Sequence, residues 1–164
     1  MKAQATMREI GLAALIMVAL LVYLYFSVPN IPNSNPPVKE ECRFDSELAC
    51  SSSVFLRRGS SKLELAISQN TGKPINITSV VCTKKRGIPI MVPLNNSILI
   101  ASGSKEYVSG STTGNEVICT DADGKSIPDA SLGNVYEGRL YITYIEVKTW
   151  NMELVNGTIT AKYS

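Results

Sequence analysis

An uninterrupted apolar stretch near the start of the chain constrains its folding more than any other feature. Residues 10–26 (IGLAALIMVALLVYLYF) contain one glycine and two tyrosines among otherwise apolar residues, and no charged residue follows Glu9 before Lys39. As a helix, this stretch would span about 25 Å, close to the thickness of a bilayer's hydrocarbon core. A stretch without a polar face needs lipid, a protein interior or copies of itself around it. We therefore expect a long N-terminal hydrophobic helix that ends near Val28.

Three roles for this stretch can be compared from the residues themselves. A cleaved secretory signal needs small residues at its cleavage site, whereas bulky Tyr-Leu-Tyr-Phe stands at 23–26. A helix buried in a soluble core normally has polar residues on one face, and this one has none. A single-span membrane anchor remains open. Lys2 and Arg8 on the short flank favour an N-terminus in the cytoplasm and the rest of the chain outside.

The remainder of the chain divides into a linker and a globular domain. Residues 29–41 (PNIPNSNPPVKEE) hold four prolines and three asparagines, a composition that favours extended, semi-rigid backbone. Residues 42–164 contain several short runs of alternating or β-branched residues, and turn residues separate them. This pattern predicts an all-β domain, either a sandwich or a barrel. The expected strands are 54–56, 62–67, 75–82, 88–92, 97–100, 106–108, 116–119, 139–147 and 155–163.

The cysteines indicate an oxidising compartment. All four, Cys42, Cys50, Cys82 and Cys119, lie in the β domain, and an even count in a small exported domain favours two disulfides. Of the three connectivities that four cysteines allow, we favour 42–50, which are near in sequence, and 82–119, which both end strand-like runs. A structural zinc site is disfavoured because no two of these cysteines have the close spacing of zinc ligand pairs.

Three sequons for N-linked glycosylation lie in the same domain. They begin at Asn76, Asn95 and Asn156. One three-residue match means little, but three in a domain placed outside the cell predict sugars on one or more of these asparagines.

Few residue combinations in the chain can support catalysis. The chain has no histidine, which removes imidazole bases and imidazole metal ligands, and its serine-rich stretches have no base partner. Residues 121–124 (DADG) are similar to the start of a calcium loop, but the later ligand positions are missing, so a polar turn is the better interpretation. The formal net charge of +2 gives no basic field for nucleic acid. We therefore expect no enzyme activity, cofactor, metal or nucleic-acid partner.

The first residues of the chain form a recognisable motif. Lys2-Ala3-Gln4-Ala5-Thr6-Met7-Arg8-Glu9 runs directly into the apolar stretch. This arrangement resembles the N-terminus of archaeal type IV pilins, which have a short basic leader, a small residue and Gln at the processing point, and a Glu in the first turns of the helix. The resemblance implies processing at Ala3 and Gln4 by a prepilin peptidase. It also implies that Glu9 acts in assembly by pairing with the N-terminal ammonium of a neighbouring subunit, with Arg8 as a competing partner within the same chain.

Motifs in the β domain extend this resemblance. The runs at 42–44, 48–50, 63–72 and 75–83 are similar in order and spacing to the start of cysteine-containing archaeal pilin-like domains, and those at 138–144 and 155–161 to their last two strands. The resemblance implies a structural subunit of an extracellular pilus-like filament with an adhesive or other surface role. Such a subunit is inserted in the cytoplasmic membrane before the pilus assembly machinery adds it to a helical homopolymer.

The sequence thus predicts an α+β chain in three parts. These are a leader and hydrophobic helix at 1–28, the linker at 29–41, and an extracellular β-sandwich of immunoglobulin-like or pilin type at 42–164. We expect assembly through the helix, with Leu15 and Val18 in its buried part. The alternative is a single-span membrane-anchored extracellular β domain with a binding or envelope role.

Overall fold

Residues 15–23, 39–50, 54–110 and 112–164 are described by the structure, a computed structural model. The chain divides into two compact units, Met1–Pro37 and Val38–Ser164, and each is described by itself. The second unit starts slightly before the expected domain boundary at Cys42, because its first strand begins at Glu41.

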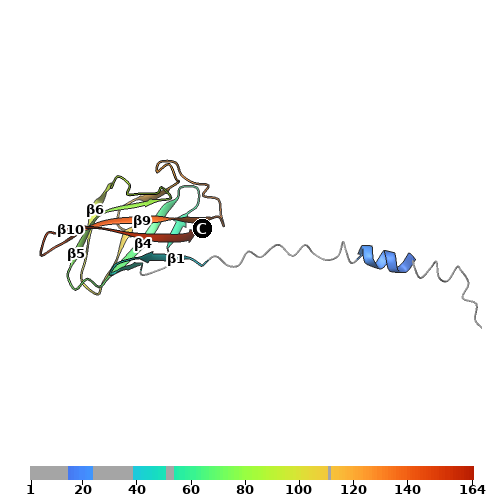
Figure 1. The fold of residues 1–164 in the computed structure, drawn as a ribbon, viewed down its shortest axis with the longest axis horizontal. Helices are drawn as coiled ribbons and strands as arrows, with labels where there is room; N and C mark the ends of the chain where they lie inside the picture. Colours follow the sequence, from blue (N-terminus) through green and yellow to red (C-terminus); the bar gives the residue numbers. More distant parts are fainter. Residues whose placement is uncertain (1–14, 24–38, 51–53, 111) are drawn as a thin grey trace, which may run out of the picture. The chain divides into compact units, whose positions relative to one another are not determined.

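The N-terminal unit contains a short helix at residues 15–23, drawn in blue in Figure 1. The expectation of a long N-terminal hydrophobic helix, and with it the α+β class, is wrong, because this helix covers nine residues. Among the described residues, no helix combines the length and apolar content needed to cross a membrane. All nine residues are exposed. A helix this short gains little stability without a packed face, since the cost of nucleation is spread over few hydrogen bonds. The rest of the expected helix lies outside the described residues.

The second unit is built from strands joined by turns (Figure 1). The strands are β1 (Glu41–Phe44), β2 (Leu48–Cys50), β3 (Phe55–Arg57), β4 (Lys62–Gln69), β5 (Ile75–Thr83), β6 (Pro93–Ile100), β7 (Lys105–Ser109), β8 (Val117–Thr120), β9 (Val135–Glu146) and β10 (Met152–Lys162).

These strands form one hydrogen-bonded sheet that closes around a core. Its order is β1-β10-β9-β5-β8-β4-β2, with β6 paired to β5, and β3 and β7 paired to β4. Leu56 of β3 bridges Tyr163, just beyond β10, so the two sides of the sheet meet. The expected sandwich is therefore corrected to one continuous sheet, because β8 pairs with both β4 and β5 and links the two sides.

Along each strand, successive side chains point to opposite faces of the sheet, and this alternation decides which of them enter the core. In β4, Leu63, Leu65 and Ile67 are at most 1% exposed, and their apolar surface is the main stabilising contribution of the strand. In β9 both faces are buried near the middle. Leu140 and Ile142 face the core, whereas Tyr141 points outward beneath the loop that follows β5 and donates from its hydroxyl to the Gly87 carbonyl at 2.9 Å. This loop therefore covers part of the outer face.

Candidate functional site

The residues expected to act in assembly and processing fall in the N-terminal unit. Leu15 and Val18 lie on the short helix and are 71% and 59% exposed. The remaining large side chains of the helix are 50–69% exposed and are Ile16, Met17, Leu20, Leu21, Val22 and Tyr23. Apolar side chains therefore surround this helix on every side. Ala3, Gln4 and Glu9 lie outside the described residues.

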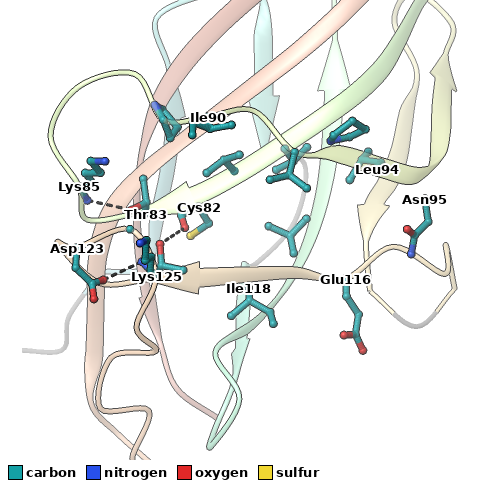
Figure 2. Close-up of a pocket in the computed structure, with 18 residues that line it drawn as sticks. Cys82, Thr83, Lys85, Ile90, Leu94, Asn95, Glu116, Ile118, Asp123 and Lys125 are labelled. Carbon is teal, nitrogen blue, oxygen red and sulfur yellow. Dashed lines mark hydrogen bonds between the residues drawn. The ribbon is translucent and has the colours of Figure 1, made fainter.

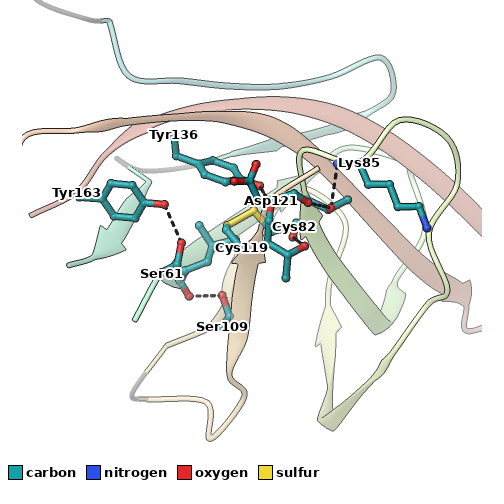
Figure 3. The surroundings of a disulfide bond; sticks show 11 residues. Ser61, Cys82, Lys85, Ser109, Cys119, Asp121, Tyr136 and Tyr163 are labelled. Carbon is teal, nitrogen blue, oxygen red and sulfur yellow. Dashed lines mark hydrogen bonds between the residues drawn. A yellow bond between two sulfur atoms is a disulfide. The ribbon is translucent and has the colours of Figure 1, made fainter. Parts of the chain in front are cut away.

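Both disulfides are present with the pairing that the sequence favours. Cys82 of β5 and Cys119 of β8 lie opposite each other in the parallel strand pair, and both side chains are buried (Figure 3). Cys42 of β1 and Cys50 of β2 are half-buried, with Cα atoms 5.8 Å apart. Two disulfides in one small domain are compatible with an extracellular location.

Two buried tyrosines lie beside the Cys82–Cys119 bond (Figure 3). The Tyr136 hydroxyl donates to the Thr120 carbonyl at 3.0 Å, and the hydroxyls of Tyr163 and Ser61 share a hydrogen bond of 2.8 Å. Their rings meet edge to face. Burial raises the pKa of both phenols above the usual range. Both phenols therefore stay neutral, and their rings pack between β8 and the end of β10.

An open groove of about 580 Å³ lies between the end of β5, the loop at residues 84–92, the start of β6 and β8 (Figure 2). Ile90, Val92, Leu94 and Ile118 supply apolar walls, and Ile90 is 91% exposed. A hollow of this composition can hold an apolar group.

Several polar groups around the groove already form hydrogen bonds within the β unit. Asp123 accepts hydrogen bonds from the backbone amides of Lys125 and Ser126 at 2.8 and 2.9 Å, and these bonds lower the pKa of its carboxyl. The Thr83 and Thr120 hydroxyls donate to backbone carbonyls. Within the described ranges, no group of three or more His, Cys, Asp or Glu side chains could hold a metal ion. The lining of the groove thus combines exposed apolar walls with polar groups that are hydrogen-bonded within the β unit.

The three sequon asparagines lie on different strands. Asn76 is half-buried on β5, whereas Asn95 on β6 and Asn156 on β10 are exposed. The Asn95 amide also donates to the Gly114 carbonyl across a long 3.5 Å contact. The structure thus presents all three asparagines at the surface of the β unit.

Local sequence patterns did not reveal two of these surface features. Residues 88–92 were expected to form a strand, yet they have no regular secondary structure and form a wall of the groove. Pro89 was a usable signal, because proline cannot donate a backbone hydrogen bond to a sheet. Trp150 is the second such feature: it is 79% exposed at the turn between β9 and β10, with φ of 59°.

No model of a known protein family matches this chain, and no curated protein matches it either.

Proposed function

We propose that this protein is a structural subunit of an extracellular filament, assembled by burying its apolar N-terminal segment. The observation that carries the proposal is the exposure of every large apolar side chain on residues 15–23. Each such side chain is stabilised by about 1.5–3 kcal/mol when it is removed from water. Several of them together provide a strong drive for association around this segment.

Copies of the same segment are a suitable cover for one another. Residues 10–26 include one glycine and three alanines, which let neighbouring backbones approach closely. Repetition of one contact with a rotation that does not close produces a helical filament. The similarity of the N-terminal motif and the β-domain motifs to archaeal type IV pilins agrees with this proposal.

The second unit suits the outside of such a filament. It has its own core and two disulfides, so it can withstand an extracellular environment without the N-terminal unit. The linker at 29–41, rich in proline, would set the reach between a buried apolar segment and the exposed β unit.

A charge placed in the apolar segment tests the proposal. Leu15→Asp and Val18→Asp should abolish filaments, because an unpaired carboxylate in an apolar assembly costs several kcal/mol. Leu132→Asp is the matched control, since Leu132 is a similarly exposed leucine (67%) in the β unit. The readout is the yield of sheared filaments by electron microscopy, with export measured separately.

Equal filament yield from Leu15→Asp and wild type would contradict the proposal.

The second candidate function, an extracellular domain held at the membrane with a binding or envelope role, is favoured by the apolar groove beside β8. That function predicts no filaments from wild-type cells that contain the assembly machinery, and loss of membrane attachment in the Leu15→Asp variant.

A further inference from the structure

Four residues from four neighbouring strands form a row on the outer face of the sheet. Asn76 of β5 lies opposite Leu99 of β6 and Ile145 of β9, and Ile145 lies opposite Met152 of β10. We call these four residues the outer row. Leu99 and Met152 are 61% and 68% exposed, whereas Asn76 and Ile145 are half-buried. The outer row therefore presents three apolar side chains to solvent with one asparagine among them.

The outer row differs from the other end of the same face. On β9 and β10, Thr143 lies opposite Leu154 beside the row, and neither residue carries a charge. Further along, Arg139 lies opposite Thr158. A sheet face in water normally carries polar side chains, as it does around Arg139. The exposed apolar side chains at the Asn76 end of this sheet face therefore mark a surface against which another group is expected to pack.

The Asn76 side chain is available for modification. The Asn95 amide donates to Gly114, and the Asn96 amide donates to Thr113, whereas no residue in the described part of the chain forms a hydrogen bond with the Asn76 amide. A protein that covered Asn76 without pairing its amide would lose about 1–3 kcal/mol. Thr78, two residues further along β5, completes a sequon.

We propose that Asn76 carries an N-linked glycan whose first sugars lie over Leu99, Ile145 and Met152. Directly opposed side chains on neighbouring strands have Cβ atoms about 5 Å apart, so the first sugar reaches Leu99 and Ile145 from Asn76. Sugar rings have apolar C–H faces and polar edges. The glycan thus covers the outer row and presents hydroxyl groups to water in its place.

The attachment is a glycosyl transfer from a lipid-linked sugar phosphate, catalysed by a transferase outside the cytoplasmic membrane. The Asn76 Nδ2 atom bonds to the anomeric carbon of the donor sugar. The bond from that carbon to the phosphate oxygen breaks, and the lipid phosphate leaves with the electron pair. The amide loses one proton to a base of the transferase. This inference requires only that the domain is exported. It does not depend on filament assembly, so it stands even if assembly fails.

Substitutions at Thr78 separate the glycan from the shape of the site. Thr78→Val removes the sequon with little change in volume, and Thr78→Ser keeps both the sequon and the hydroxyl that donates to the Thr143 carbonyl at 3.2 Å. Asn76→Gln is a second variant that removes the site and keeps that hydrogen bond. Each protein is purified from cells that normally make it, and glycopeptide mass spectrometry reports the occupancy of residue 76.

Wild type and Thr78→Ser should carry sugar on Asn76, and both other variants should lack it. The bare variants should bind the apolar dye 8-anilinonaphthalene-1-sulfonate several-fold more strongly. Adding Ile145→Thr and Met152→Thr to Asn76→Gln should reverse that increase. A bare Asn76 in the wild-type protein would overturn the inference, as would equal dye binding by folded glycosylated and bare proteins.

Discussion

At the scale of single residues, Lys73 and Glu146 connect two turns at one end of the β unit. Lys73 lies in the turn between β4 and β5, and Glu146 is the last residue of β9. The Lys73 ammonium donates to Glu146 Oε2 at 2.8 Å, and the Thr149 hydroxyl donates to the same oxygen at 2.5 Å. These bonds, that from Lys73 first, hold the pKa of the Glu146 carboxyl below its usual range.

We expect this carboxylate to make stability depend on acid pH. Because its pKa is lower in the folded state, it stabilises the fold fully above its ordinary pKa of 4.5, and this contribution is lost as the pH falls through the lower folded value. Glu146→Gln should therefore weaken the pH dependence of the urea midpoint below about pH 5, and Lys73→Met should do the same to a smaller extent. An unchanged pH dependence in Glu146→Gln would contradict this assignment.

The two disulfides should contribute unequally to stability. Cys82–Cys119 joins residues 37 apart and is buried, whereas Cys42–Cys50 joins residues 8 apart and is half-buried. The chain-entropy model gives about 4 kcal/mol for the longer loop and about 2.5 kcal/mol for the shorter one. Urea unfolding of the double alanine variants at 82 and 119, and at 42 and 50, measures the difference. A larger loss from the 42–50 pair would refute the order.

At the scale of elements, the alternation of apolar and polar residues predicts the long strands. It fails where pairing with other strands determines the structure. The strands β4 and β5 occur at Lys62–Gln69 and Ile75–Thr83, where 62–67 and 75–82 were expected. The strands β1 and β2 were not predicted, because neither of these short segments contains a β-branched residue. Pairing with β10 and β4, and the disulfide between them, hold these two strands in place.

The candidate sites were predictable only as far as they are local in sequence. The sequon at Asn76 can be read directly from three residues. The outer row depends on the register of β5, β6, β9 and β10, and no local pattern carries that register. The groove depends on the parallel pairing of β5 with β8, which brings together strands separated by two others in the sequence.

Gly157 tests the attachment of β1 to β10. It is buried opposite Phe44, and a Cβ atom at this position would collide with the Arg43 carbonyl oxygen and the Phe44 ring. Gly157→Ala should lower the free energy of unfolding by about 1–3 kcal/mol and speed amide hydrogen exchange in β1. Thr158→Ser, at the exposed next position, is the control and should leave both unchanged. Unchanged exchange in β1 of the Gly157→Ala protein would contradict this packing argument.

At the scale of the whole molecule, the two units meet water in different ways. The second unit buries its apolar strand faces in a single core, whereas the helix at 15–23 is exposed throughout. The prediction of a long helix was wrong because apolar composition shows only that a segment must be shielded from water. It does not set how far a helix extends before lipid or protein surrounds the segment.

This difference predicts that the second unit folds alone. A fragment covering residues 38–164 should be monomeric and unfold cooperatively, because its core and both disulfides lie within it. Size-exclusion chromatography and near-ultraviolet circular dichroism measure this directly. A fragment without fixed tertiary signals would show that the β unit needs the N-terminal residues.

The most direct test of the proposed function is electron microscopy of material sheared from cells that make the protein, combined with mass spectrometry of the same material. The filament proposal predicts helical filaments whose subunit is this chain, with both disulfides intact and the apolar segment retained. The opposite result is full-length protein that remains a membrane-bound monomer in cells holding the assembly machinery, with no filament that contains it.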